Sequence, residues 1–332
     1  MKKYFRTKST LEIIALISTL LGITIVGLFL ARAWYDGYII LNNPISLDRA
    51  SKIGDFIGGL VGVIFTLVGV FLLIETLSLQ RNEFISNRKA FNHQLFENGL
   101  FNLMASQREI LSDTKYNGKN GREFFSFLKT EIIKTYKLIK TARLPDLYPM
   151  EETIINQLLT VDYITKRHNC NEGFVGREAN LVTAFKEIFQ NIDRDNEEKV
   201  VTEAYWIIFY KYHNYYGHYF RHLYHILKYI YESEIYSQEN TEHEKDEKHE
   251  ERYRNYADLI QSTLSTDELL IMFFNGICFK NMGKLLHKYN FLENLPIEDL
   301  LDKTHVTMYN GKEIDGVQYK AIKFKSMNNE VS

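Results

Sequence analysis

Two long stretches without a charged residue lie near the start of the chain, at residues 13–31 and 56–74. As an α-helix, each would be about 28 Å long, close to the bilayer hydrocarbon thickness of about 30 Å. Neither has the polar stripe that a helix of this length shows at the surface of a soluble protein. The pattern predicts two transmembrane helices, at about residues 11–32 and 53–77, with the lipid bilayer as a partner.

A cleaved signal peptide is the alternative interpretation of the first stretch. The chain begins with a basic cluster, and Ala31-Arg32-Ala33 has the small-x-small form of a cleavage site. The apolar stretch is longer than that of a usual signal peptide, which favours a retained helix. Cleavage would leave the second helix as the membrane anchor.

The distribution of Lys and Arg predicts the orientation in the membrane. Basic residues are frequent in the N-terminal tail and directly after the second stretch, at Arg81, Arg88 and Lys89. The basic residues of the connecting loop are partly balanced by Asp36 and Asp48. The positive-inside rule therefore predicts a multi-pass protein of the bacterial inner (cytoplasmic) membrane, with both termini in the cytoplasm.

Small residues recur at intervals of four in the second apolar helix, so they share one side of it. Such a row allows close backbone contact in lipid and predicts a packing seam, although glycine is also simply common in membrane helices. The seam would pack either against the first helix, where the small residues Ser18 and Gly22 form a matching notch, or against another subunit. The second case predicts a homo-oligomer. The row consists of Gly54, Gly58, Gly62 and Thr66.

After residue 80 the apolar positions recur at the spacing of amphipathic helices. Ser265 and Glu268 form a capping box, which predicts a helix start just before Leu269. The acidic segment at residues 232–251 predicts a solvated loop, with an exposed helix extension as the alternative. Asn310-Gly311 and Asp315-Gly316 predict a small C-terminal β-hairpin. Further helices are predicted at residues 82–112, 122–142, 151–167, 178–191 and 197–231.

The predicted fold class is therefore mainly α, with a two-helix membrane anchor at residues 1–80 and an all-α cytoplasmic helical domain at residues 81–332. The 40 Lys and Arg nearly balance the 42 Asp and Glu, which argues against a general nucleic-acid binder. Two cysteines exclude a disulfide framework and a four-cysteine zinc site, and Cys170 has no recognisable catalytic base beside it. The sequence contains no familiar phosphate-binding, hydrolase or metalloprotease motif, so no cofactor is predicted and an enzyme is disfavoured.

Three histidines in the most aromatic segment form the one candidate metal site. His218, His222 and His225 share a helix face at spacings of four and three, and imidazole suits zinc and similar ions. Three ligands from one straight helix rarely converge on a single ion, and no carboxylate is interleaved to orient them. The spacing therefore favours a polar face packed beside Tyr215 and Tyr229 over a metal centre.

Arg221 and His225 form the one candidate catalytic pair. HEPN-type ribonucleases carry Arg-x4–6-His on one helix, whereas Arg221 and His225 give Arg-x3-His, one residue short. A structural ion pair between Arg221 and a buried carboxylate is favoured over contact with phosphate or RNA. Asn275 and Glu268 are further polar candidates, although Glu268 already has a capping role.

Several sequence blocks, taken in order, resemble the phage abortive infection family (putAbiC-type, AbiC-like proteins of bacteria). The resemblance spans about residues 54–295 and implies a role in anti-phage defence, in which the infected cell stops growing or dies before phage progeny emerge. It implies no settled catalytic residues. The blocks are Gly54-Asp-Phe-Ile-Gly-Gly59, Phe96-Glu97 with Phe101-Asn102-Leu103, Gly121-Arg122-Glu-Phe124-Phe125, Tyr219-Phe220-Arg221-His-Leu223-Tyr224 with Lys228-Tyr-Ile230, and Leu264-Ser265-x2-Glu268-Leu269 ending at Asn275.

Three mechanisms are compatible with these features. The favoured one is a membrane effector, whose helices assemble or perturb the bilayer when the cytoplasmic domain senses a phage-derived trigger. The second is a sensor or scaffold that recruits a partner defence protein. The third is a membrane-tethered HEPN-like ribonuclease.

Overall fold

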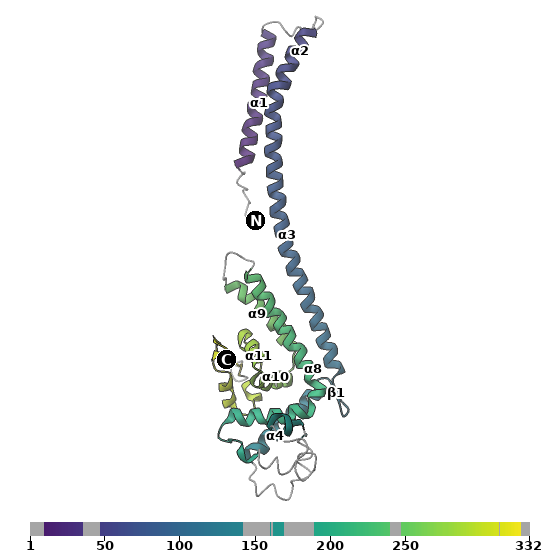
Figure 1. Cartoon of the computed structure of the whole chain (residues 1–332), viewed down its shortest axis with the longest axis vertical. Coiled ribbons are helices and arrows are strands. Elements are labelled where there is room, and N and C mark those ends of the chain that lie inside the picture. Colours follow the sequence, from purple (N-terminus) through teal and green to yellow (C-terminus); the bar gives the residue numbers. More distant parts are fainter. Residues whose placement is uncertain are drawn as a thin grey trace. The chain divides into compact units, whose positions relative to one another are not determined.

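The computed structural model describes residues 10–35, 47–141, 160, 162–168, 189–239, 247–311 and 313–326. The described chain is mostly helical, with two small strand pairs, in agreement with the predicted mainly α class (Figure 1). It divides into two compact units, Met1–Leu95 and Phe96–Ser332. Each unit is described by itself.

The first unit contains α1 (Thr10–Tyr35), α2 (Leu47–Phe56), the π-helical turn η1 (Ile57–Val61) and the start of α3 (Gly62–Asp113). Helix α1 packs against η1 and the first turns of α3. A Cβ atom added to Gly22 would lie 3.4 Å from Ile64, and the rings of Phe29 and Phe56 stack with centroids 4.1 Å apart. The predicted notch at Gly22 therefore contacts α3.

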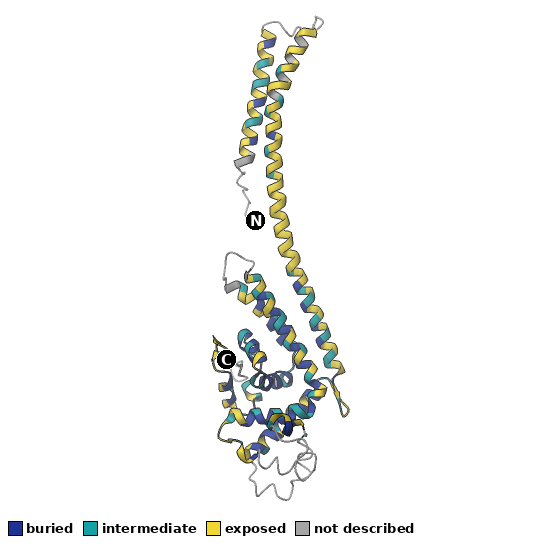
Figure 2. Cartoon of the chain, viewed as in Figure 1, coloured by how far each residue is buried: buried dark blue, intermediate teal, exposed yellow. Residues whose placement is uncertain are grey.

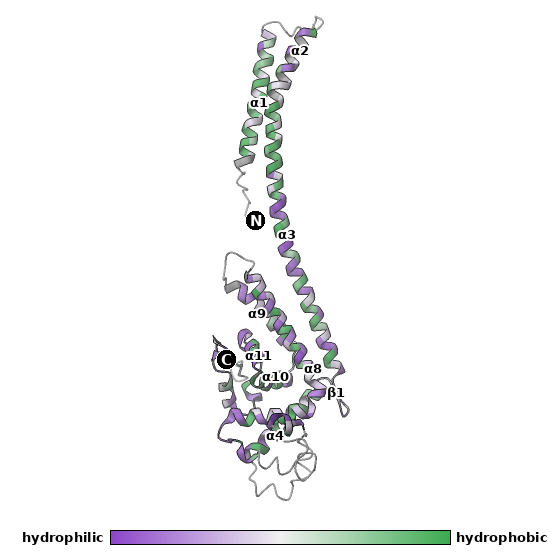
Figure 3. Cartoon of the chain, viewed as in Figure 1, coloured by the Kyte–Doolittle hydropathy of each residue, from purple (hydrophilic) through white to green (hydrophobic). Residues whose placement is uncertain are grey.

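Most large apolar side chains of α1 and of the first half of α3 are exposed (Figure 2), although these are the most hydrophobic segments of the chain (Figure 3). By length and composition, the helices at Ile13–Tyr35 and Gly54–Asp113 could each cross a membrane. Leaving this much apolar surface in water would cost about 25 cal/mol per Å². The exposure therefore agrees with the two predicted apolar helices.

Helix α3 runs without a break to Asp113, whereas the sequence pattern predicts one helix ending near residue 77 and another starting at residue 82. The junction at residues 75–83 contains no Gly or Pro and is rich in strong helix formers such as Glu75, Leu79 and Arg81. Nothing in this junction stops a helix once it has started, so the two predicted helices are one.

The long helix α8 (Glu197–Glu239) lies at the centre of the second unit and packs against the other main helices of that unit. Its core is rich in fully buried aromatic side chains, among them Phe124, Tyr205 and Phe273. The remaining helical elements are α4 (Arg122–Thr141), η3 (Tyr163–Arg167), α9 (Glu247–Gln261), α10 (Thr266–Cys278), α11 (Lys280–Tyr289), η4 (Ile297–Asp299) and η5 (Lys303–Tyr309).

The helices predicted at residues 122–142 and 197–231 are confirmed as α4 and α8. The capping box is also confirmed at the start of α10, where the Ser265 hydroxyl accepts from the Glu268 amide and the Glu268 side chain accepts from the Ser265 amide. Most of the helices predicted at residues 151–167 and 178–191, together with Cys170, lie outside the described residues.

Two short antiparallel hairpins complete the described fold. Strands β3 (Glu313–Ile314) and β4 (Val317–Gln318) pair around Asp315-Gly316, which confirms the predicted hairpin. At Asn310-Gly311 the chain instead leaves η5 in an extended conformation. Strands β1 (Lys115–Tyr116) and β2 (Lys119–Asn120) form a second hairpin, between the helices predicted at residues 82–112 and 122–142. Its turn uses positive φ angles of 47° at Asn117 and 78° at Gly118.

The acidic segment is helical on both sides of residues 240–246, which lie outside the described part. Helix α8 continues to Glu239 and α9 begins at Glu247, so residues 232–239 and 247–251 follow the alternative of a helix extension rather than the predicted loop. Within this part of α8, Glu234 is buried rather than solvated. Its carboxylate accepts a hydrogen bond from Tyr289 at 2.8 Å and pairs with Lys288 at 2.9 Å.

Candidate functional site

Helix α8 carries the histidines and the arginine that the sequence singles out. His218, Arg221 and His225 are exposed, whereas His222 is half-buried. The Nδ1 atom of His222 lies 2.7 Å from Oε1 of Gln107 on α3. The same Gln107 side chain donates from Nε2 to the carbonyl oxygen of Tyr219 at 3.4 Å. The glutamine oxygen is therefore the acceptor, and His222 donates its Nδ1 proton to it.

The three histidines do not form a metal-binding group in the part of the chain that the structure describes. Burial lowers the pKa of His222, and the neighbouring His225 lowers it further, so His222 is neutral near pH 7. Its hydrogen bond to Gln107 fixes α8 against α3. This contact gives His222 a packing role of the kind that the sequence spacing favours.

Arg221 and His225 lie one helical turn apart, as the sequence predicts, and no hydrogen bond between them is seen among the described residues. The His225 ring instead contacts the adjacent Tyr224, with centroids 5.3 Å apart. The ion pair expected between Arg221 and a buried carboxylate is also not seen in the described part of the chain. Arg221 lines a cavity instead.

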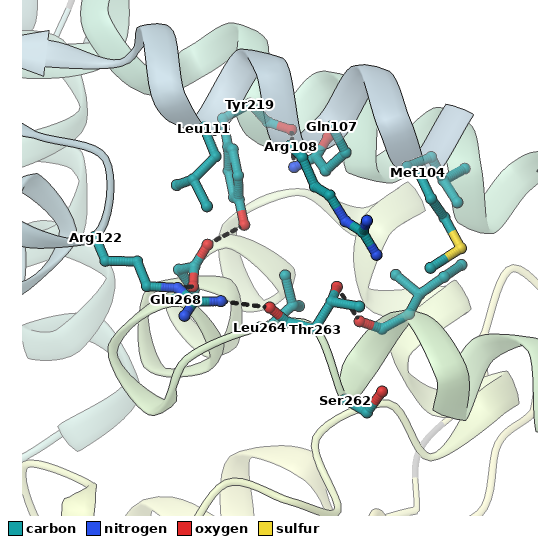
Figure 4. Close-up of a pocket in the computed structure, with 12 residues that line it drawn as sticks. Met104, Gln107, Arg108, Leu111, Arg122, Tyr219, Ser262, Thr263, Leu264 and Glu268 are labelled. Atoms are coloured by element: carbon teal, nitrogen blue, oxygen red, sulfur yellow. Dashed lines mark hydrogen bonds and ion pairs between the residues drawn. The ribbon is translucent and has the colours of Figure 1, made fainter. Parts of the chain in front are cut away.

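A buried carboxylate lies where α8, α10 and the start of α4 meet (Figure 4). Glu268 is fully buried and accepts a hydrogen bond from the Tyr219 hydroxyl through Oε1. Its Oε2 accepts from the Ser265 amide at 2.7 Å and from the Ser265 hydroxyl at 2.6 Å. Arg122 approaches the same oxygen at 3.5 Å and donates to the carbonyl oxygen of Thr263 at 2.8 Å. We call these four side chains (Arg122, Tyr219, Ser265 and Glu268) the Glu268 network.

The Glu268 network is suited to holding helices together rather than to proton transfer. Burial, together with the negative charge of Glu268, raises the pKa of Tyr219 well above its usual value, so the phenol stays protonated as a donor. Both carboxylate oxygens already have donors, and one partner is the positive charge of Arg122. A carboxylate whose two oxygens already accept hydrogen bonds is a poor general base. Losing one of these donors would leave a buried charge without a partner in apolar surroundings.

A cavity of about 290 Å³ borders the Glu268 network. Figure 4 shows the Arg108 side chain pointing into it between Met104 and Thr263. Its walls mix apolar side chains of α3, α8 and α9 with the charged Arg108, Arg122 and Glu268. The cavity has no aromatic wall apart from Tyr219.

A second cavity, of about 310 Å³, lies between α8, the end of α10 and the start of α11. We call it the aromatic cavity, because ring side chains form most of its wall. Arg221, Asn275 and Asn281 are the non-aromatic polar side chains that reach it. The lining residues are Phe209, His213, Tyr216, Gly217, Phe220, Arg221, Tyr224, Asn275, Phe279, Asn281 and Met282.

Cys278, the free cysteine among the described residues, is an inert thiol. Burial raises its pKa to about 12, with Arg167 opposing the shift and Glu203 adding to it. At neutral pH the thiolate required for nucleophilic attack is therefore almost absent. The described chain offers no cysteine nucleophile.

In the first unit, the glycine row keeps the α-helical spacing of four only in part. The π-helical turn η1 lies between Gly54 and Gly62 and interrupts the α-helical register. A Cβ atom added to Gly54 or Gly58 would have no neighbour within 4 Å, and Thr66 donates its hydroxyl proton to the Gly62 carbonyl at 2.8 Å. The row is thus not covered by α1 at Gly54 and Gly58.

Part of the chain matches a known protein family. Residues 211–300 match the model of the family described as "Putative phage abortive infection protein". This confirms the family resemblance over these residues and supports a role in phage defence. The sequence blocks before residue 211 are outside the match and stay predictions. No curated protein and no solved structure matches the chain.

The matched segment contains most of both sites. Tyr219, Ser265 and Glu268 of the Glu268 network lie within it, as do the lining residues of the aromatic cavity except Phe209. Arg221, Asn275 and Glu268 are candidate site residues from the sequence alone, whereas the aromatic cavity has no sequence motif. The signal that could have pointed to it is Gly217, a glycine in the interior of a long helix with no packing reason to be small.

Proposed function

We propose that this chain is a membrane-anchored effector of phage defence that arrests or kills the infected cell. The observation that carries the defence role is the family match over residues 211–300. The two exposed apolar helices support membrane anchoring, since their length suits a bilayer. In this proposal the cytoplasmic helical domain senses a phage-derived trigger, and the membrane helices then assemble or perturb the inner membrane.

The open glycines of the anchor support assembly between copies. Gly54 and Gly58 have room for a neighbouring backbone, whereas Gly22 already contacts the second helix of its own chain. Close packing at small residues stabilises helix pairs in lipid through van der Waals contact. A change in the helical domain would shift the population of assembled anchors by its differential affinity for the two states.

The central experiment is inducible expression of the full chain in bacteria, with and without phage. Fractionation, membrane potential and RNA integrity are measured in the same cultures. We expect the chain in the membrane fraction, a reporter at the C terminus to be active inside the cell, and depolarisation before loss of viability. Recovery of the full-length chain in the soluble fraction, or growth arrest at an unchanged membrane potential, would contradict the proposal.

A substitution at the glycine row tests the assembly step. Gly58→Leu is expected to abolish depolarisation while the protein still reaches the membrane, because a large side chain prevents close backbone approach. Gly27→Leu is the matched control, since Gly27 lies in α1 with no neighbour within 4 Å. Equal depolarisation by both variants would rule out the glycine row as the seam.

The same cultures separate the two alternative mechanisms. A HEPN-like ribonuclease would degrade RNA before depolarisation, and it would lose this activity in Arg221→Ala and His225→Ala. A sensor or scaffold would lose toxicity when a neighbouring defence gene is deleted. Intact RNA and gene-independent toxicity are the results that the effector proposal expects.

A further inference from the structure

The aromatic cavity has the composition of a small-molecule site. Such sites are concave and mostly apolar, with a few polar groups that orient the ligand. Here the rings of Phe209, Tyr216, Phe220, Tyr224 and Phe279 supply the apolar wall. Aromatic walls of this kind stack readily on planar ring systems, including nucleobases.

Gly217 provides an independent sign that the cavity is kept open. Glycine in a helix interior costs about 1 kcal/mol relative to alanine. A Cβ atom at Gly217 would meet only the Cβ of His213, at 3.8 Å, which is an ordinary contact. Packing therefore does not require glycine at this position. Gly217 lines the cavity, and its missing side chain leaves space in the cavity wall.

The polar groups of the cavity have bonding capacity left over. Arg221 is exposed at the cavity and has no hydrogen-bond or ion-pair partner among the described residues. Asn275 donates from Nδ2 to the Tyr205 hydroxyl at 2.8 Å, which leaves its carboxamide oxygen to accept. A ligand that fills the cavity would meet a cation and a carboxamide.

His213 adds a defined acceptor at the same wall. Its Nδ1 lies 3.2 Å from the carbonyl oxygen of Phe209 and 3.3 Å from that of Tyr210, so Nδ1 carries the proton that is donated. The ring stacks on Phe209 with centroids 5.2 Å apart. In the neutral ring the Nε2 atom is therefore the acceptor.

We propose that the aromatic cavity binds a single free nucleotide, with the base against the aromatic wall and the phosphate at Arg221. The guanidinium group matches phosphate through paired hydrogen bonds, and asparagine carboxamides match the donor and acceptor edge of a base. The cavity that borders the Glu268 network is less suited, because it lacks an aromatic wall for stacking and holds the Glu268 carboxylate. This proposal does not depend on the membrane step of the proposed function.

The test is a binding titration of the full chain in nanodiscs. The probes are adenosine, guanosine, cytidine and uridine 5′-monophosphates, each beside the matching nucleoside without phosphate. We expect at least one monophosphate to bind with a measurable Kd. Arg221→Gln is expected to weaken that monophosphate about ten-fold or more, as for loss of a charged hydrogen bond, and to leave the nucleoside unchanged.

Two further variants fix the location of the site. In Gly217→Leu the leucine side chain fills the cavity, and leucine is a good helix former. We therefore expect an unchanged unfolding temperature and loss of both nucleotide and nucleoside binding. Arg108→Gln is the matched control, because Arg108 is also an exposed arginine that lines a cavity, but the other one. It is expected to bind like the parent chain.

The proposal is overturned if none of the four monophosphates binds. It is equally overturned if Arg221→Gln binds like the parent chain, or if Arg108→Gln weakens binding as much as Arg221→Gln. Because Arg221 is exposed, its replacement does not disturb the core. The Arg221 arm therefore decides the question even where Gly217→Leu fails to fold.

Discussion

Removing one hydroxyl group tests whether the Glu268 network holds the helical unit together. The Tyr219→Phe substitution keeps the buried ring and deletes the donor to Glu268 Oε1. The other donors that the structure gives Glu268, from Ser265 and Arg122, reach Oε2. The substitution therefore leaves one oxygen of a buried carboxylate without the tyrosine donor.

The magnitude follows from the burial of the pair. Tyr219 and Glu268 are both fully buried, so solvent screening does not reduce the loss. A hydrogen bond to a charged group contributes about 1.5–3 kcal/mol. Unfolding temperatures of domains of this size fall by about 2–4 °C per kcal/mol, so we expect a decrease of about 3–12 °C.

Tryptophan fluorescence reports this unfolding when one tryptophan is removed. The chain contains two tryptophans, Trp34 in α1 and Trp206 in α8. In a Trp34→Phe background, Trp206 reports the helical unit, where its ring contacts Phe279 with centroids 5.2 Å apart. Thermal unfolding of the full chain in detergent is then followed by fluorescence alone.

Tyr215→Phe is the matched control, because Tyr215 lies on the same helix and is 41 % exposed. We expect it to change the unfolding temperature by less than about 2 °C, as is typical of a surface substitution. The double variant Tyr219→Phe with Glu268→Gln should be less destabilised than the two single effects summed, since the charge that needs the donor is gone. An equal, small effect of Tyr219→Phe and Tyr215→Phe would refute a structural role of the Glu268 network.

Three further predictions concern the same unit and are measured by denaturant unfolding of the full chain. Burial lowers the pKa of His305 from 6.5 to about 4, so the unfolded chain binds the extra proton between these pH values. We therefore expect about 2–3 kcal/mol of stability to be lost on acidification from pH 6.5 to 4, and a smaller loss in His305→Gln. Gly276→Ala should lower the free energy of unfolding by about 1–3 kcal/mol or more, because the new Cβ would overlap neighbouring side chains. Gly217→Ala should instead raise the free energy of unfolding by up to about 1 kcal/mol, because its Cβ has room and alanine is the better helix former. Lys288→Ala should cost about 1–3 kcal/mol, because it leaves buried Glu234 without its cation, and an unchanged midpoint would contradict this.

Local signals in the sequence predict much of this fold. The spacing of apolar positions predicts α4 and α8, and the Ser265–Glu268 pair predicts the start of α10. Asp315-Gly316 predicts a hairpin, because both residues take the positive φ that such a turn requires. These features depend on residues within a few positions of one another, which is why a single sequence reveals them.

The contacts that build the sites are distant in sequence, and no local pattern reveals them. His222 meets a glutamine 115 residues away, and Tyr219 meets a glutamate 49 residues away. The sequence identifies Glu268 as a cap but not as a buried charge, because capping is a local function and burial is decided by packing. For the same reason, the acidic segment predicts solvent exposure although Glu234 is buried.

A recurring contact gives the many tyrosines of this chain a common physical role. In the helical unit, tyrosine hydroxyls repeatedly donate to glutamate carboxylates. Three of these acids, Glu203, Glu234 and Glu268, are buried, and there the hydrogen bond offsets part of the cost of burying a charge. Phenylalanine in these positions would supply the same ring but no donor. The pairs are Tyr136 with Glu197, Tyr163 with Glu203, Tyr219 with Glu268, Tyr256 with Glu97, and Tyr289 with Glu234.

These pairs predict that the helical unit unfolds at alkaline pH. Burial, followed by the charge of the paired glutamate, raises the pKa of Tyr163, Tyr219 and Tyr289 well above the usual 10. Above pH 10 the unfolded chain releases these protons while the folded chain keeps them, so the stability falls as pH rises. At a pH of about 11 each of the three contributes a loss of about 1.4 kcal/mol, or about 4 kcal/mol together, a large share of a typical domain stability.

Tyrosinate absorbance and Trp206 fluorescence, recorded together in the Trp34→Phe chain during an alkaline titration, measure this directly. We expect exposed tyrosines to ionise first, and the buried ones to ionise only as Trp206 reports unfolding. The Tyr219→Phe chain starts from a lower stability, because it lacks one hydrogen bond. Its stability should fall less steeply above pH 10, since it has one phenol fewer that stays protonated only in the folded state. Ionisation of all tyrosines near pH 10 in a chain that remains folded would show that the carboxylates do not hold the phenols protonated, and the common role assigned to these pairs would be wrong.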